Sequence, residues 1–425
     1  MTGNRRDGEL LVRAQSPGEK KRIRAHRLFA RCRQLPDKEG RRGYCGAKAS
    51  AGNEDKAEKP GLWGRFWDRF RLRRYKLKPA DVAKRLALPE AHRGHTDAQW
   101  EWWCFNGHLE TASGRKFDYF WSFFKVIMDD DTFLGIPVRY FTKPFYVPFF
   151  FGGTSLFDHE KKKYVFGVRS TLPFFWTANY SKEDMDLRLL DYTARREEDD
   201  TFRVRSSVGR NKLNLQLTPV RPPILYGYKG NGVLDFPEAR HNYYSLPRLK
   251  TTGTIKTGRN LETVTGVSWM DHQYGFIHNE EFKGWDWMCA HLDNGVDLMF
   301  AHVRLFDGEV LRQSTGAVMY PDGRTVHLRK EKFILKPLRY WKSRFTRITY
   351  AVDWEMEVPG MEIRLRSRAH VDAQQMILWP MVFWEGSNSI SGVFEGEEVN
   401  GQGFLETFGD YNPFGRRIYK TGMRR

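Results

Sequence analysis

From about residue 95 onward, hydrophobic and polar positions alternate with the period of two that is typical of β-strands. The alternation is clearest in 213–217, which reads Leu-Asn-Leu-Gln-Leu, and in 361–366, which reads Met-Glu-Ile-Arg-Leu-Arg. Dipeptides that favour tight turns, such as Asn294-Gly295, separate many of these runs. The pattern therefore predicts an all-β fold built from antiparallel hairpins. The expected strand runs include 116–127, 163–169, 186–193, 202–208, 212–217, 297–305 and 361–369.

Two segments of the chain resemble each other. Residues 102–110 read Trp-Trp-Cys-Phe-Asn-Gly-His-Leu-Glu and align with 285–293, Trp-Asp-Trp-Met-Cys-Ala-His-Leu-Asp, so that Trp, His and Leu fall on identical residues. A self-similar segment near the start of each half indicates two related structural units. We therefore expect an N-terminal β-barrel domain over 91–250 and a C-terminal one over 251–415.

The first 60 residues are basic and lack a long apolar run, which predicts a disordered leader. This leader contains no apolar core of a secretory signal, and its many acidic residues are untypical of a transit peptide. A start codon assigned too far upstream explains the same segment equally well.

A basic aromatic segment follows the leader. Residues 61–77 have the spacing of an amphipathic helix with aromatic residues on one face and basic residues on the other, so we expect a helix and linker over 61–90. Such a helix suits an anionic membrane surface, and docking onto the barrel is the alternative. No segment is long and apolar enough to span a membrane, so we expect a cytoplasmic protein in peripheral contact with the inner membrane. The aromatic face would hold Trp63, Phe66, Trp67, Phe70 and Leu77, and the basic face Arg65, Arg69, Arg73 and Lys76.

The composition narrows the classes of ligand. Aromatic residues make up 15% of the chain and include 14 Trp, which suits a pocket for a large hydrophobic molecule. The formal net charge of +18 is concentrated in the N-terminal leader, which speaks against a nucleic-acid-binding core. The 4 cysteines form no CxxC pair and imply neither a disulfide framework nor a zinc site.

The candidate chemistry centres on Asp271, which lies among Trp269, His272 and Tyr274. A carboxyl group surrounded by aromatic rings loses hydration in its charged form, so its pKa rises and it can act as a general acid. The alternative is a structural carboxylate that caps backbone amides while the aromatic residues fill a core. An aromatic segment upstream, beginning at His241, could complete the site.

In combination, six motifs spread over residues 92–412 resemble the carotenoid 1,2-hydratase (hydroxyneurosporene synthase) or AttH-type family of lipocalin-like proteins. The resemblance implies two lipocalin-like antiparallel β-barrel domains with a hydrophobic site near their junction. The family includes hydratases, cyclases and lipid-handling proteins, so the resemblance indicates the fold more closely than the substrate. The motifs are Glu101-Trp102-Trp103-x-Phe105-x-Gly107-His108-Leu109, Tyr243-Tyr244-Ser245, Gly266-x-Ser268-Trp269-Met270-Asp271-His272-Gln273, Gly284-Trp285-Asp286-Trp287, Leu292-Asp293-x-Gly295-x-Asp297-Leu298-Met299 and Trp384-Glu385-Gly386.

The resemblance also implies roles for individual residues. Asp271 would protonate an isolated alkene, with Trp269, His241 and Tyr243 shaping the site of the carbocation. The chain has Trp at 269 and Tyr at 243, where carotenoid hydratases favour Tyr and Trp, and this exchange speaks against a carotenoid more than against the acid chemistry. The residues expected to bind the substrate are His272, Tyr274, Trp102, Trp285, Trp287 and Trp384.

Other polar residues give weaker signals. We expect Glu385 to be a structural carboxylate near a strand end, whereas Glu101, Asp286 and Glu406 could line the cavity or bond to the backbone. A metal set of His272, His278, Glu280, Glu281 and His291 lacks HExxH spacing, so no metal is expected, and no Gly-rich nucleotide-binding motif occurs.

Two classes of function follow from the sequence. The first is a cofactor-free enzyme that hydrates, cyclises or isomerises a hydrophobic, isoprenoid-like alkene through a carbocation. The second is a non-catalytic lipocalin-like carrier of a hydrophobic lipid or isoprenoid. The position of Asp271 separates them, because a carrier needs only apolar walls.

Overall fold

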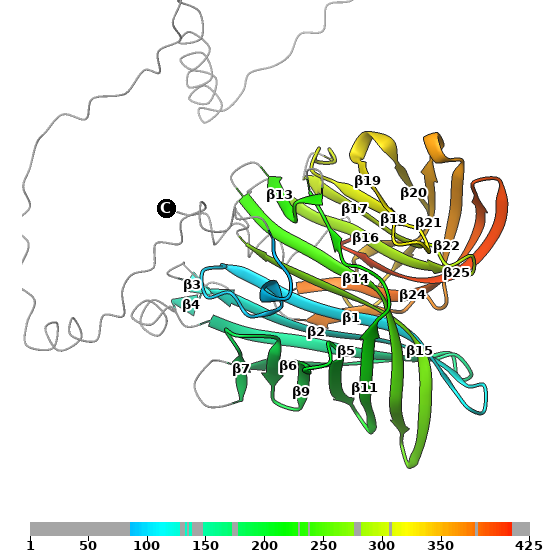
Figure 1. The fold of residues 1–425 in the computed structure, drawn as a ribbon. Coiled ribbons are helices and arrows are strands. Elements are labelled where there is room, and N and C mark those ends of the chain that lie inside the picture. The colour runs from blue at the N-terminus through cyan, green and yellow to red at the C-terminus, as the bar shows by residue number, and fades with distance from the viewer. Residues whose placement is uncertain are drawn as a thin grey trace, which may run out of the picture. The chain divides into compact units, whose positions relative to one another are not determined.

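The computed structural model describes residues 86–127, 132–133, 136–137, 148–171, 177–227, 230–236, 239–275, 282–305, 308–378 and 381–409. These ranges form almost entirely antiparallel β-structure in two large sheets, one of which curls nearly into a barrel (Figure 1). The all-β, lipocalin-like prediction is therefore confirmed. The leader over 1–60 and the helix over 61–77 lie outside the described residues. Within the described ranges, no helix has the length and apolar character to cross a membrane.

The first sheet contains 13 of the described strands in the order β6-β5-β2-β1-β15-β14-β11-β10-β9-β8-β7, with β12 and β13 pairing to β14. A small separate ribbon joins β3 (Thr132–Phe133) to β4 (Ile136–Pro137). The strands of the sheet are β1 (Trp100–Thr111), β2 (Lys116–Ile127), β5 (Pro148–Asp158), β6 (Lys163–Thr171), β7 (Ala178–Tyr180), β8 (Asp186–Leu189), β9 (Tyr192–Arg196), β10 (Phe202–Val208), β11 (Asn211–Pro219), β12 (Ile224–Leu225), β13 (Val233–Phe236), β14 (Ala239–Thr257) and β15 (Asn260–Gly275).

The second sheet contains 10 of the described strands in the order β19-β18-β17-β16-β25-β24-β22-β21-β20, with β23 pairing to β24. Short 3-10 turns lie at Glu90–His92, Lys330–Lys332 and Pro359–Met361. The strands are β16 (Phe282–Leu292), β17 (Asp297–Leu305), β18 (Thr315–Met319), β19 (Thr325–Arg329), β20 (Ile334–Lys342), β21 (Thr349–Val358), β22 (Ile363–Ala369), β23 (Gln375–Leu378), β24 (Met381–Phe394) and β25 (Glu397–Thr407).

The boundary between the two halves differs from the expected one at residue 250. That position falls inside β14, and the following strand β15 pairs with both β1 and β14 in the first sheet. The reason is the long hairpin of β14 and β15. Its second strand, β15, also pairs with β1, so β15 cannot belong to the second sheet without losing its hydrogen bonds to β1. The second half therefore begins at β16.

Three apolar clusters stabilise the described part. One lies within each sheet, and the third lies between the sheets, where it joins residues of β1, β2 and β5 to residues of β16, β24 and β25. Strand β1 contributes side chains to two cores. Trp103 and Phe105 pack in the core of the first sheet, and Cys104 packs in the cluster between the sheets. Side chains alternate between the two faces of a strand, so a strand buried on both faces reads as a continuous apolar run.

The repeated segments meet at this junction. They form β1 and β16, and residues that align in the sequence contact each other in space, so the repeat corresponds to an approximate two-fold relation between the halves. The indoles of Trp102 and Trp285 stack at 6.2 Å and 5°, the Cys289 thiol lies 3.6 Å from Asn106 Oδ1, and the rings of His108 and His291 meet edge to face at 6.3 Å.

The same relation extends to hydrogen bonds within each half. His108 Nδ1 lies 2.8 Å from Asp118 Oδ1, across the pairing of β1 with β2. His291 Nδ1 lies 2.8 Å from Asp297 Oδ1, across the equivalent pairing of β16 with β17. Both carboxylates are buried, so each histidine satisfies a group that would otherwise be costly to bury.

Candidate active site

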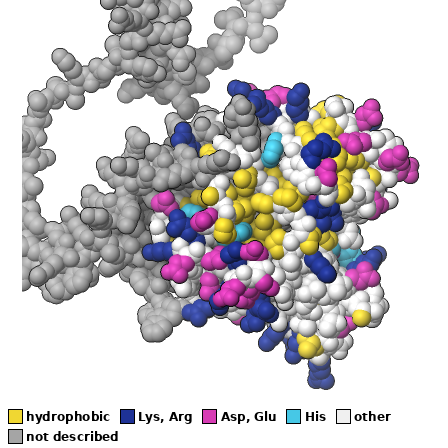
Figure 2. Space-filling model, viewed as in Figure 1, with side chains coloured by type: hydrophobic (Ala, Val, Ile, Leu, Met, Phe, Trp, Pro, Cys, Tyr) yellow, Lys and Arg dark blue, Asp and Glu magenta, His cyan; other side chains and the backbone are white. Residues whose placement is uncertain are grey.

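A cavity lies at the junction and takes residues from both halves. It contains about 1090 Å³ of space that no protein atom fills, the open solvent at its mouth included. On the face shown in Figure 2, hydrophobic side chains gather over the region where Figure 1 places β13, β14, β16 and β17, strands that contribute to the cavity. The lining residues are Trp102, Cys104, Asn106, Phe120, Phe124, Leu234, His241, Tyr243, Asp271, Gln273, Trp285, Trp287, Ala301, Val303, Leu311, Gln313, Ser314, Thr315, Glu385 and Glu406.

The Asp271 carboxyl group faces this cavity from the middle of the first sheet. Its strand β15 runs between β1 and β14, where Asp271 is the register partner of Cys104 and of Ser245. Only 8% of the residue is exposed, and burial raises the pKa of the carboxyl to about 7. A large fraction of Asp271 therefore carries a proton at neutral pH, as a general acid requires.

Three donors surround the Asp271 carboxyl and favour its charged form. Trp269 Nε1 donates to Asp271 Oδ1 over 2.8 Å, and the hydroxyl of Ser245 donates to the same oxygen. The Tyr243 hydroxyl also hydrogen-bonds the carboxyl. These bonds lower the pKa, but the loss of hydration outweighs them. The group is thus protonated before reaction, and its anion is stabilised once the proton has left.

A second layer of polar contacts holds these donors in place. The hydroxyls of Tyr226 and Ser245 lie 2.9 Å apart, so a proton donated by Tyr226 leaves the Ser245 proton free for Asp271. Trp287 Nε1 donates to the Tyr243 hydroxyl over 2.9 Å and thereby ties the two halves together at the site. Burial raises the pKa of Tyr243 well above its usual value, so this hydroxyl stays a neutral donor.

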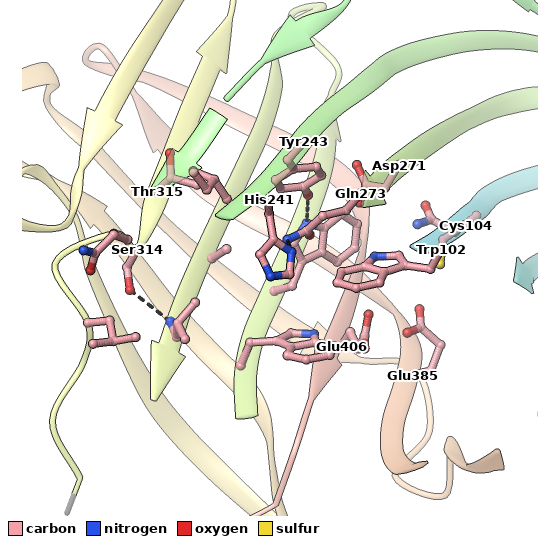
Figure 3. A pocket seen from close by; sticks show the side chains of 18 of the residues that line it. Trp102, Cys104, His241, Tyr243, Asp271, Gln273, Ser314, Thr315, Glu385 and Glu406 are labelled. Atoms are coloured by element: carbon pink, nitrogen blue, oxygen red, sulfur yellow. Dashed lines mark hydrogen bonds between the residues drawn. The ribbon is translucent and has the colours of Figure 1, made fainter. Parts of the chain in front are cut away.

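His241 lies on the cavity wall opposite the indole of Trp102 (Figure 3). Gln273 Nε2 lies 2.9 Å from His241 Nδ1, so Nδ1 accepts the amide proton. The other ring nitrogen of His241, Nε2, takes no part in this bond. The side chains of His241, Tyr243, Trp269 and Asp271 are thus brought together, as the family resemblance implies. Their catalytic roles remain a prediction.

Of the six residues expected to bind substrate, three line the cavity and three do not. Trp102, Trp285 and Trp287 form an aromatic wall, whereas His272 and Tyr274 point to the opposite face of β15. The reason is strand alternation: 269, 271 and 273 share one face, so 272 and 274 share the other.

The three excluded residues have structural contacts instead. His272 Nε2 lies 3.1 Å from Glu101 Oε1, and the Tyr274 ring stacks on His95 at 3.6 Å. Trp384 is packed in the core of the second sheet, where its indole nitrogen donates to the Asp372 carbonyl over 2.6 Å. These three residues belong to the framework, and the expectation that they bind substrate is corrected.

Of the four other acidic residues considered in the sequence, two line the cavity and two do not. Glu101 and Asp286 lie outside the cavity lining, where they form ion pairs with Lys125 at 2.6 Å and with Arg304 at 2.7 Å. Glu406 lines the cavity, and so does Glu385, which the sequence analysis treated as structural. Glu385 can be identified only from its register pairing with Glu406, and no local sequence motif reveals that pairing.

Only two of the five residues considered as metal ligands in the sequence, His272 and His291, lie in the described ranges. His278, Glu280 and Glu281 lie outside them, and His272 and His291 bind different carboxylates. Two other sets have ligand atoms within 4.8 Å of one another: His95 with Glu101 and His272, and Asp118 with His159 and His370. Lys125 already supplies a positive charge to Glu101 in the first set. Neither set contributes a side chain to the cavity lining.

Comparisons with known proteins agree with this fold. A sequence model of the AttH-like family matches residues 79–410. The structure is similar to that of a candidate AttH protein from Nitrosomonas europaea, with 25% identity, a TM-score of 0.67 and coverage of 78% of this chain and 98% of that one. It is also similar to kievitone hydratase from Nectria haematococca, with 16% identity, a TM-score of 0.59 and coverage of 76% and 93%. No curated protein matches the sequence.

Proposed function

The chain belongs to the AttH-like family, and from that premise we propose that it is an enzyme that adds water to a C=C bond of a hydrophobic, isoprenoid-like molecule by acid catalysis, without a cofactor. The same carbocation would also permit cyclisation or isomerisation. The observation that carries the proposal is the Asp271 carboxyl, which lies buried in an aromatic cavity with its pKa raised to about 7. A carrier of hydrophobic ligands has no use for such a group.

The proposed reaction begins with proton transfer from Asp271 to one alkene carbon. The other carbon becomes a carbocation, and the new carboxylate is held by Trp269, Ser245 and Tyr243. Because these bonds strengthen as negative charge develops, they act mainly in the transition state. Water then bonds to the cation, its surplus proton returns to the carboxylate directly or through solvent, and an alcohol is released.

The aromatic wall suits the charge that forms. The indoles of Trp102 and Trp285 stack on each other across the junction and both line the cavity. A ring face over a desolvated cation contributes about 2 kcal/mol. The fold shared with kievitone hydratase supports a hydratase, since it shows that this architecture accommodates such an enzyme.

The test of this function is incorporation of oxygen from water. Purified protein is incubated with acyclic and cyclic isoprenoid alkenes in water enriched in heavy oxygen, and products are analysed by mass spectrometry. We expect a labelled alcohol with the wild type and none with Asp271→Asn. Apolar ligands that bind equally to both proteins without any conversion would indicate the carrier instead.

We also propose that residues 61–77 bind an anionic membrane surface, on the strength of their aromatic and basic sequence pattern alone. Binding to anionic vesicles should weaken with added salt and in the variant Trp63→Ala with Trp67→Ala, because charge attraction and apolar insertion both contribute. Binding that neither salt nor the substitutions change would contradict this proposal.

A further inference from the structure

Two carboxyl groups of the second sheet lie side by side on the cavity wall. Glu385 on β24 and Glu406 on β25 are register partners, so their Cβ atoms lie roughly 5 Å apart. Figure 3 shows both side chains in the pocket, and in that view the indole of Trp102 lies between them and Asp271. The cavity therefore has two polar groups, which we call its poles: Asp271 in the first half and the pair of Glu385 and Glu406 in the second half. An aromatic wall lies between these poles.

Glu385 lacks the partners that a structural carboxylate has, and the Trp285 side chain hydrogen-bonds the carboxyl of its neighbour Glu406. Glu385 is 1% exposed, and neither of its carboxyl oxygens has a hydrogen-bond partner among the described residues. The lining set contains no Lys or Arg, and the Nδ1 atom of its histidine, His241, is bound to Gln273. A buried carboxyl without a cation stays neutral, and a neutral carboxyl without a partner has an unused donor.

Buried polar groups in native proteins are paired almost without exception, so the unpaired carboxyl of Glu385 in the lining of a ligand cavity indicates a partner on the ligand. A protonated carboxyl donates to a carbonyl or hydroxyl oxygen. An anionic ligand group is excluded on electrostatic grounds, because no lining cation would neutralise it. With the alkene at Asp271, the glutamate pair on the wall of the second half is left for the ligand's oxygen.

We propose that Glu385 and Glu406 bind a neutral carbonyl or hydroxyl oxygen of the substrate, so that the substrate is an oxygenated hydrophobic alkene and not a pure hydrocarbon. This inference rests on the proposed function, because it takes the alkene to lie at Asp271. It assigns the two carboxyl groups a binding role that does not depend on proton transfer by Asp271.

The test measures binding through quenching of Trp fluorescence with two probes. The probes are geranylacetone, an isoprenoid ketone, and the hydrocarbon in which a methylene group replaces its carbonyl. The compared quantity is the ratio of the two Kd values, because the difference in hydrophobicity between the probes is the same for every variant. In wild type at about pH 6, where the carboxyls are protonated, the ketone gains a hydrogen bond that the hydrocarbon leaves unmade.

Glu385→Leu removes the donor and should lower the preference for the ketone about tenfold, without weakening hydrocarbon binding. Glu385→Gln keeps an N–H donor and should retain most of the preference. Glu357→Leu, on a strand that does not line the cavity, is the matched control and should change nothing. A Leu variant that keeps the wild-type ratio, or a wild type that does not bind the ketone, would overturn the proposal.

A second arm covers the case in which the Leu variant fails to fold. Burial and the charge of Asp271 raise the pKa of Glu406 to about 8, against a hydrogen bond from Trp285 that lowers it. Burial and the charges of Glu406 and Asp271 raise the pKa of Glu385 well above its usual value. Raising the pH to about 9.5 should therefore abolish the ketone preference of the wild type, since an ionised carboxylate cannot donate. The double variant Glu385→Gln with Glu406→Gln should show no such pH dependence, and dependence that persists there contradicts the proposal.

The outcome is independent of the proposed reaction. Asp271→Asn should abolish turnover and keep the Kd ratio, because the ketone lies at the other pole. A normal ratio without turnover in the wild type would contradict the proposed hydration alone, whereas turnover without any ketone preference would contradict this inference alone.

Discussion

The two walls of the cavity occupy equivalent positions in the two halves but differ in the groups that surround the acid. In the first half, Asp271 pairs in register with Ser245 on one side and Cys104 on the other. In the second half, Glu406 pairs with Glu385 and Trp287 in the same arrangement. The repeat aligns Cys104 with Trp287, so Glu406 is the counterpart of Asp271 and Glu385 the counterpart of Ser245.

Two of the three donors around Asp271 have no counterpart at the equivalent position of the second half, where Glu406 has one side-chain hydrogen bond, with Trp285. The position of Trp269, two residues before the acid, corresponds to Phe404, and the position of Tyr243 corresponds to Phe383. An indole N–H and a phenol are thus replaced by rings without a donor. The pKa of Asp271 rises to about 7 and that of Glu406 to about 8, each chiefly because of burial.

The difference teaches how one scaffold produces two kinds of carboxyl group. Several donors that stabilise the anion suit an acid that must release its proton, whereas a carboxyl with fewer donors keeps its proton more readily and suits a hydrogen bond to a ligand. The His–Asp pairs, by contrast, have the same 2.8 Å geometry in both halves, which indicates a shared structural role. The predictions below test this comparison.

The largest effect should come from Asp271→Asn, which removes the titrating proton and keeps the size of the side chain. We expect turnover to fall by about 10²- to 10⁴-fold or more, because that is the usual contribution of a general acid. Single-turnover kinetics with the identified alkene measure the loss. Glu110→Gln, on the exposed side of β1, is the control and should retain wild-type rates.

The same Asp271→Asn substitution should stabilise the protein at alkaline pH. The folded pKa of about 7 lies above the usual aspartate pKa of 3.8, so the folded state binds the proton more tightly than the unfolded state does. The resulting penalty is absent below about pH 4, grows as pH rises, and reaches about 4 kcal/mol above pH 7. Denaturant unfolding at about pH 5 and pH 8 measures it, and wild type and variant with the same pH dependence would contradict the raised pKa.

Trp269→Phe should make the first wall resemble the second, because it removes one donor from the anion of Asp271 and keeps an aromatic ring. The pKa of Asp271 should rise by about one to two units, the usual value of a hydrogen bond to a charged group. Activity that needs the protonated form is present below this pKa and lost above it, so the alkaline limb of the pH–rate profile should move upward. An unmoved limb would show that Trp269 has no influence on the acid.

The smallest difference is expected between His108→Ala and His291→Ala. Each removes one partner of a buried carboxylate, and each should cost about 2 kcal/mol of unfolding free energy. Both carboxylates keep a further partner, His159 for Asp118 and Arg248 for Asp297. Thermal or chemical unfolding should therefore give similar losses, and a cost confined to one half would break the structural equivalence.

The sequence predicts the fold class and the main acid because both leave local signals. Hairpin punctuation indicates the strands, and the flanking aromatic residues identify Asp271. Which residues share its face was harder to predict, since β15 is buried on both sides around 268–272 and shows no polar alternation there. For that reason the sequence alone predicts His272 and Tyr274 in the cavity, although they lie on the opposite face of β15.

The pairing of Glu385 with Glu406 on the cavity wall could not be predicted from local sequence. Glu385 lies between Trp384 and Gly386, a context equally compatible with a structural carboxylate. Its position in the cavity depends on the pairing of β24 with β25 and of β25 with β16, and the second of these pairings joins residues more than a hundred positions apart. Only the repeated segment, extended through these ladders, reveals the correspondence with Asp271.

The central claim is that Asp271 carries a proton at neutral pH in the cavity. Infrared difference spectroscopy of wild type against Asp271→Asn isolates the carbonyl stretch of this one protonated carboxyl and needs no substrate. The account predicts that the band persists through mildly acidic pH and titrates with a midpoint of about 7. A band already lost at about pH 5, as for an ordinary aspartate, would contradict it.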